Sequence, residues 1–114
     1  MLGLNDSVEI GSFADVPASG TGLGSSSAFT VALIRAIQEY QGTVSTKPEI
    51  AEMACEIEIQ RCKDPIGRQD QWASALGGIN KIEFLKDKVE YKSIQISTDQ
   101  TQSFSKKMFL FHIG

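Results

Sequence analysis

"PASGTGLGSSSAFTVALIRAI", residues 17–37, begins with glycines and serines and then turns apolar. Its apolar residues recur at helical spacing over residues 25–40, which predicts a helix there. The glycine-rich half has three interpretations: a flexible linker, a structural tight turn, or a phosphate-binding loop. Glycines let backbone N–H groups approach a ligand, and a helix N-terminus attracts anions. Leu23, which interrupts the glycines, and the serines at the start of the helix favour the phosphate-binding loop.

The loop matches neither of two common phosphate-binding sequences. No lysine follows it in the register of a Walker A motif, and Ser25 stands where a Rossmann fingerprint has its third glycine. The loop alone therefore indicates phosphate binding and no particular reaction.

The rest of the sequence predicts an α+β fold, because helical patterns are followed by strand patterns. A second helix is expected to begin after Ser45 or Thr46 and to end before Asp64-Pro65, and a third spans residues 68–76. Gly42 and Gly77-Gly78 are the expected helix stops. The expected strands are residues 7–16, 79–85, 89–96 and 107–113, with a turn at Lys86-Asp87 between the second and the third.

Composition and charge exclude several classes of protein. The 114 residues carry a net charge of −3 and no cluster of Lys or Arg, so no nucleic-acid partner is expected. No apolar run is long enough to cross a membrane, and the first ten residues lack the pattern of a signal peptide. Cys55 and Cys62 share one face of the second helix, which indicates core packing in a reducing cytoplasm. His112 is the single histidine, which argues against a histidine-based metal site or a Ser/His/Asp triad.

Glu58 is the first candidate for chemistry, because it falls on the apolar face of the second helix, between Ala54 and Cys62. A carboxylate there is costly unless it is paired or binds a metal. The alternative to a metal or active-site role is a salt bridge to Arg61.

Asp70 is the second candidate. The residues that would share its helix face are Ala73, Ser74 and Gly77, all small, so a substrate would have room beside the carboxylate. The alternative is that Asp70 only complements the dipole of a helix whose first turn it occupies.

The loop resembles the second motif of the GHMP kinases, usually written P-x-x-x-G-L-G-S-S-A. Gly22 to Ser26 match it directly, although Ala28 comes one residue late and four residues, not three, separate Pro17 from Gly22. The resemblance implies that this loop wraps the triphosphate of ATP and that Ser26 helps to hold Mg²⁺. The nucleotide-binding residues implied in this way are Pro17, Ser19, Gly20, Thr21, Gly22, Leu23, Gly24, Ser25, Ser26 and Ser27.

A second segment, "GRQDQWASALGG", resembles the part of the same family that carries the catalytic aspartate. By this resemblance Asp70 is the base, or orients the sugar hydroxyl, and Glu58 is the magnesium-binding glutamate three helical turns upstream. Within the family, both segments are most similar to the D-glycero-D-manno-heptose 7-phosphate kinases. Those enzymes have a basic residue two positions before the aspartate, so Arg68 is expected to touch a phosphate, the alternative being an ordinary surface arginine.

The resemblance implies an N-terminal domain of the ribosomal protein S5 domain 2 type, with helices on a mostly antiparallel sheet. Residues 1–114 correspond to the central part of that domain, and the family's first and third motifs are absent from them. We therefore expect a fragment with little turnover of its own, in which exposed strand edges allow pairing with a second copy as a homodimer.

The function implied is that of a cytoplasmic kinase, which uses ATP and Mg²⁺ to phosphorylate a sugar or sugar phosphate, here a heptose phosphate. A kinase of the galactose or fucose type and a non-catalytic nucleotide- or sugar-binding relative are the alternatives.

Overall fold

The computed structural model describes residue 3 and residues 7–15 and 22–111. The fold is α+β, as the sequence predicted, and it divides into two compact units, Met1–Leu76 and Gly77–Gly114. The first unit contains the candidate site. No helix among the described residues is both long enough and apolar enough to cross a membrane.

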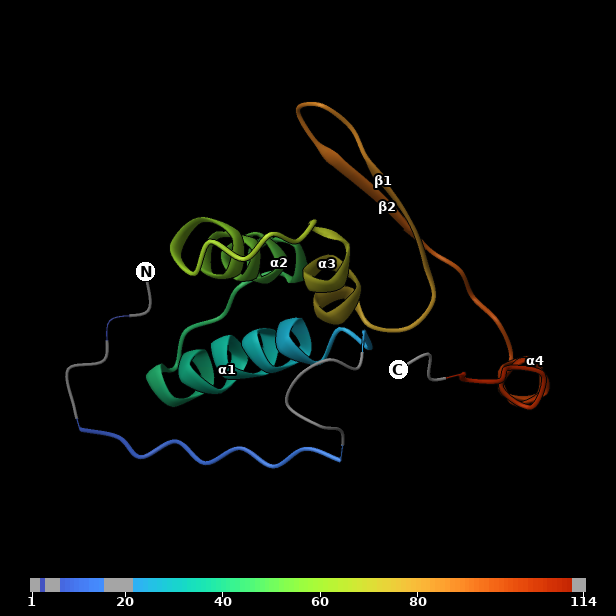
Figure 1. Ribbon diagram of the computed structural model, residues 1–114, viewed down its shortest axis with the longest axis horizontal. Coiled ribbons are helices and arrows are strands. Elements are labelled where there is room, and N and C mark those ends of the chain that lie inside the picture. The colour runs from blue at the N-terminus through green and yellow to red at the C-terminus, as the bar shows by residue number, and fades with distance from the viewer. Residues whose placement is uncertain (1–2, 4–6, 16–21, 112–114) are drawn as a thin grey trace. The chain divides into compact units, whose positions relative to one another are not determined.

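The first unit is built from helices that pack on one another. They are α1 (Ser25–Gln41), α2 (Lys47–Cys55), a π-helical segment η1 (Glu56–Arg61) and α3 (Gln69–Leu76). Figure 1 shows α1 running below α2 and α3, and all three helices contact one another. Their buried apolar side chains form the core of the unit: Val31, Ile34, Ile50, Ala51, Ala54, Cys55, Trp72, Ala75 and Leu76.

Local sequence signals set the ends of these helices, as predicted. Gly24 and Gly42 flank α1 with φ angles of 67° and 64°, in the left-handed region that glycine adopts without strain. Thr46 caps α2 in a capping box: its side chain accepts a hydrogen bond from the Glu49 N–H, and the Glu49 carboxylate accepts one from the Thr46 N–H.

The π-helical segment corrects the prediction for the cysteines. In η1 the backbone hydrogen bonds span five residues in place of four, so the Cys62 N–H donates to the Ile57 carbonyl at 2.9 Å. The wider turn rotates later residues away from the positions of a regular α-helix. Cys55 is buried as expected, but Cys62 is exposed, so the two do not share a buried face.

The strand expected at residues 7–16 was also wrong within residues 7–15. These residues have no strand partner among the described residues. Residues 7–11 instead line a cavity together with Leu33, Ala36, Ile37 and Tyr40 of α1. An alternating pattern forms a strand only where a neighbouring strand accepts its hydrogen bonds.

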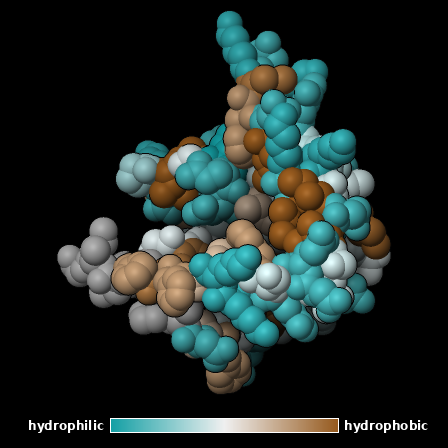
Figure 2. Space-filling model, turned by 90° about the vertical axis from the view of Figure 1, so that its right-hand side faces the viewer, coloured by the Kyte–Doolittle hydropathy of each residue, from teal (hydrophilic) through white to brown (hydrophobic). Residues whose placement is uncertain are grey.

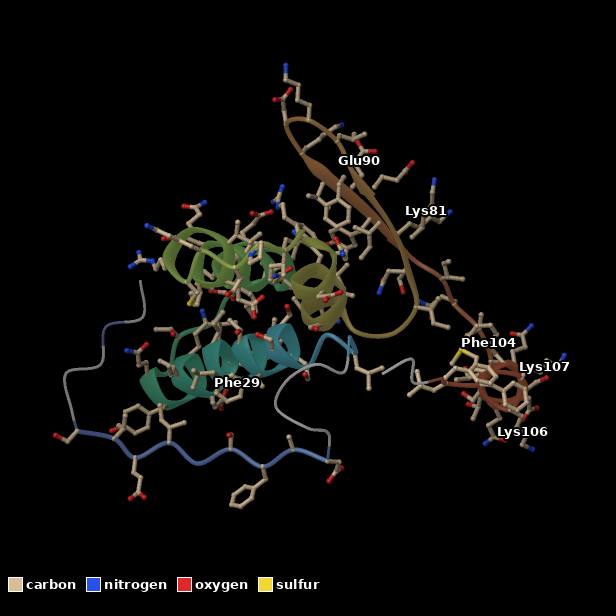
Figure 3. The ribbon with its side chains drawn as sticks, viewed as in Figure 1. Phe29, Lys81, Glu90, Phe104, Lys106 and Lys107 are labelled. Atoms are coloured by element: carbon tan, nitrogen blue, oxygen red, sulfur yellow. The ribbon has the colours of Figure 1, made fainter. Side chains whose placement is uncertain are left out.

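The second unit contains the hairpin expected from the sequence. Strands β1 (Asn80–Phe84) and β2 (Val89–Ser93) pair antiparallel, with Ile82 opposite Tyr91. Lys81 and Glu90 stand on the two neighbouring strands (Figure 3).

The end of the second unit departs from the prediction. Helix α4 (Thr98–Ser105) was not expected, although Ser97 and Gln100 form a capping box that marks its start. The strand expected at residues 107–113 is wrong for residues 107–111, and His112 and Ile113 lie outside the described residues. Hydrophobic side chains reach the surface in Figure 2, and residues 108–111 are all exposed. The homodimer contact expected at strand edges stays a prediction.

Candidate active site

Glu58 lies at the centre of the candidate site, buried as the sequence predicted, with a side chain only 2 % exposed. Four side chains donate hydrogen bonds to its carboxylate. Oε1 accepts from the hydroxyls of Ser26 at 3.0 Å and Thr30 at 2.9 Å. Oε2 accepts from the hydroxyl of Ser27 at 2.7 Å and from Nε2 of Gln71. This one carboxylate therefore connects α1, η1 and α3.

The alternative pairing of Glu58 with Arg61 is not what the structure shows. Arg61 pairs with Glu56 instead, with Nη2 2.9 Å from Oε1, and both of these side chains are largely exposed. The π-helical turn of η1 buries Glu58 and leaves Glu56 at the surface, where Glu56 can pair with Arg61.

The hydrogen bonds keep the buried carboxylate ionised. Burial raises the pKa of Glu58, because it disfavours the charged form. The donated hydrogen bonds of Ser27, Thr30, Gln71 and Ser26 together outweigh burial, so the pKa of Glu58 lies below its ordinary value. The site therefore holds a fixed negative charge at neutral pH.

The two edges of the carboxylate differ in their access to solvent. The donors to Oε2, Ser27 and Gln71, are both buried. On the Oε1 edge Ser26 is exposed and Thr30 is partly exposed. A cavity of about 330 Å³, lined in part by Ser26, Thr30 and Glu58, opens beside them. Phe29, labelled in Figure 3, also lines this cavity. Oε1 is therefore the less enclosed of the two carboxylate oxygens, although most of the cavity lining is apolar.

Asp70 lies against the start of α1. A Cβ atom added to Gly24 would be 3.4 Å from both Cγ and Oδ2 of Asp70. That separation is ordinary van der Waals contact, so what favours glycine here is its φ of 67°, which is strained for other residues. The structure thus brings the predicted catalytic carboxylate to the end of the predicted phosphate loop, two segments that are far apart in the sequence.

The N-terminus of α1 has no side-chain cap among the described residues, because its N-cap is Gly24, and its first turn contains no acidic residue. Ser25, Ser26 and Ser27 occupy this turn. Leu23 is half exposed just before it, and Gly22 is another glycine with positive φ, at 64°. The other predicted nucleotide-binding residues, Pro17, Ser19, Gly20 and Thr21, lie outside the described residues.

Arg68 is placed apart from this group. It pairs with Glu52 of α2 and lines a different cavity, with Cys55 and Gln60 among its neighbours. The structure does not bring the Arg68 guanidinium to Gly24 or Glu58 among the contacts it records, so the expected phosphate contact stays a prediction.

The donor set suits Mg²⁺ better than a softer metal. No group of three His, Cys, Asp or Glu side chains gathers as a metal site within the described part of the chain. Mg²⁺ needs no such group, because it is usually held by one or two carboxylates together with substrate phosphates and water. The Glu58 carboxylate and the Ser26 hydroxyl, already 3.0 Å apart, offer hard oxygen ligands of this kind.

Sequence reasoning missed two members of the site, Thr30 and Gln71. Thr30 lies one helical turn after Ser26, on the same side of α1, so its hydroxyl reaches the same carboxylate oxygen. Gln71 precedes Ala75 by one turn on the buried face of α3. A polar residue at an apolar position is the same signal that identified Glu58.

Comparison with known proteins identifies the family of the chain. The profile of the GHMP kinases N terminal domain matches residues 2–78, more than half of the chain. A D-glycero-alpha-D-manno-heptose 7-phosphate kinase of Campylobacter jejuni is 40% identical over 82 residues. The match covers 72% of this chain and 24% of that kinase, so the chain spans about a quarter of its relative's length. No solved structure matches this chain. Its sequence places the chain in the GHMP kinase family, through that family's N-terminal domain.

Proposed function

We propose that this protein acts as an ATP-dependent sugar kinase, which transfers the γ-phosphoryl group of ATP to a hydroxyl of D-glycero-D-manno-heptose 7-phosphate. One observation carries the proposal: the Asp70 carboxyl lies against Gly24, at the start of the helix that would receive the phosphates. A loop that only bound phosphate would need no carboxylate at this position. We assign the reaction to the cytoplasm, where ATP and sugar phosphates are available.

Asp70 is the group that would handle the proton of the acceptor hydroxyl. The hydroxyl oxygen forms a bond to the γ-phosphorus while the bond from that phosphorus to the β,γ-bridging oxygen breaks, and ADP leaves. The hydroxyl proton passes to the Asp70 carboxylate, which is exposed and so can reach a bound sugar. The small residues on its helix face leave space for that sugar.

Glu58 and Ser26 would hold Mg²⁺ at the accessible edge of the carboxylate. A triphosphate at the start of α1 brings negative charge towards two carboxylates, Glu58 and Asp70, and like charges repel each other. Bound Mg²⁺ supplies the positive charge that offsets this repulsion and neutralises the charge that develops on the phosphate oxygens. Ser26 keeps lone pairs for this contact, because its hydrogen is donated to Glu58.

The choice of sugar rests on the relative. The printed name of the Campylobacter kinase gives a heptose 7-phosphate as its substrate, and 40% identity over the matched region supports a related acceptor here. A kinase for galactose or fucose would share Asp70, Glu58 and the loop, so these residues do not decide between the acceptors.

The test is a mass-spectrometric kinase assay of the full-length protein with ATP and Mg²⁺. The panel contains D-glycero-D-manno-heptose 7-phosphate, galactose, fucose and hexose 6-phosphates, and the Asp70→Asn variant serves as the catalytic control. We expect phosphorylation of the heptose phosphate that Asp70→Asn reduces by about 10²-fold or more. Phosphorylation of galactose or fucose alone would show that this sugar, and not the heptose phosphate, is the acceptor. ATP or sugar binding without any transfer would contradict it in favour of a non-catalytic relative.

A further inference from the structure

Gln71 is the buried polar residue of the site that the reaction above does not use. Its side chain is completely buried, and it follows Asp70 directly on α3. Its Nε2 donates to Oε2 of Glu58. No described group donates to the other end of the carboxamide, Oε1.

This arrangement is unfavourable for a residue that only fills space. A buried carbonyl oxygen without a donor loses its hydration and gains nothing in return. Methionine would fill a similar volume with no such loss. The carboxamide also cannot turn over to satisfy Oε1, because that would place an oxygen against the Glu58 carboxylate. Glu58 therefore fixes the orientation of Gln71, and the unpaired oxygen is its consequence.

The contact has two geometric effects. Ser27 and Gln71 hold Oε2 on the buried side, which leaves Oε1 on the edge that Ser26 and the adjoining cavity share. The same bond ties α3 to η1 one residue after Asp70, whose carboxyl must lie against Gly24.

We propose that Gln71 is a positioning residue, which orients the Glu58 carboxylate towards the metal-binding edge and sets the placement of Asp70 against Gly24. The kinetic part of this inference rests on the proposed kinase function, whereas the metal-binding part does not. Residues that orient a metal ligand through hydrogen bonds typically change metal affinity or activity by 10–100-fold when replaced.

The experiment compares Gln71→Met in the full-length protein with the wild type and with Gln60→Met. Methionine keeps the length of the side chain and removes the donor. Gln60 is an exposed glutamine on η1, so Gln60→Met controls for the change of residue type near the site. Gln71→Glu, which has the shape of glutamine but places a second carboxylate beside Glu58, is the stronger variant. Circular dichroism establishes that each variant is folded, and if Gln71→Glu does not fold, Gln71→Met alone decides.

Two quantities are measured: kcat and KM for ATP, and the affinity for Mn²⁺ in the presence of ADP, from the electron paramagnetic resonance signal of free Mn²⁺. We expect Gln71→Met to lower kcat about tenfold or more with KM for ATP within about threefold, and to weaken Mn²⁺ binding by about tenfold. Gln60→Met should match the wild type in both.

Folded Gln71→Met with wild-type kcat and wild-type Mn²⁺ affinity would overturn the inference, even if its melting temperature fell, because that pattern describes a purely structural residue. Weaker Mn²⁺ binding by Gln71→Met in a protein that transfers no phosphate would support the inference and contradict the proposed kinase function. Failure of the inference and failure of the kinase function can therefore be told apart.

Discussion

Replacing Glu58 by alanine tests whether the buried carboxylate holds the helices together. The substitution removes the acceptor of four hydrogen bonds. Ser26 and Thr30 are at least partly exposed, so their hydroxyls can turn to water and contribute little to the loss. Ser27 and Gln71 are buried, and each would be left as a donor without its acceptor.

An unsatisfied buried donor costs about 1–3 kcal/mol, so the two together predict a loss of about 2–6 kcal/mol in the free energy of unfolding. Removing a buried charge acts in the opposite direction. The lowered pKa of Glu58 decides between the two effects, because it means that the hydrogen bonds favour the ionised form by more than burial disfavours it.

The assay is urea unfolding followed by the fluorescence of Trp72, the single tryptophan of the sequence, which is buried on α3. Glu56→Ala is the matched control. Glu56 lies on the same π-helical segment and pairs with Arg61 at the surface, where such pairs are worth about 0–1 kcal/mol. Glu58→Gln keeps the size and should fall between these two variants, so it remains measurable if Glu58→Ala does not fold. A loss for Glu58→Ala within about 1 kcal/mol of that for Glu56→Ala would refute the argument.

Three further predictions concern acidity, the loop and the thiols. Folding lowers the pKa of Glu58, so its stabilisation is present above the unfolded pKa of about 4.3 and is lost as the pH falls through the lower folded value. The free energy of unfolding of Glu58→Gln should therefore fall less steeply with decreasing pH than that of the wild type. The same acid dependence in both proteins would contradict this. Gly24→Ala should lower stability by about 1 kcal/mol, since alanine is strained at a φ of 67°. The added methyl would also contact the carboxyl of Asp70, so phosphoryl transfer should fall as well, and full activity in the kinase assay would argue against that contact. Cys62 is exposed and should react with a thiol reagent in the native protein. Cys55 is buried, and burial raises the pKa of its thiol, so Cys55 should react only in urea. Peptide mapping by mass spectrometry measures the labelling of each cysteine, and rapid labelling of Cys55 in the native protein would contradict the fold.

Local signals in the sequence were sufficient for most of the helices and for the hairpin. Glycine at both ends of α1, Thr46 at the start of α2 and the turn between β1 and β2 act over a few residues, so their effect can be read without the fold. The same kind of signal was present for α4 at Ser97 and was overlooked.

The strand predictions failed because a strand depends on a partner. Residues 7–15 and 107–111 have suitable patterns but no strand beside them within the described residues. Backbone hydrogen bonds of a strand come from another segment, which the local sequence does not specify.

For the site, the sequence determined which residue types were available: a glycine loop that opens a helix, a glutamate at an apolar position and an aspartate beside small residues. Only the tertiary structure decided what each of them contacts. In the structure Arg61 pairs with Glu56, through a π-helical turn that no regular helical pattern predicts. The Glu58 carboxylate instead accepts hydrogen bonds from hydroxyls of α1 and from Gln71. The tertiary structure also brought Asp70 against Gly24. The contacts of Glu58 and Asp70 join residues far apart in the chain, and packing of the three helices, rather than any local preference, holds them together.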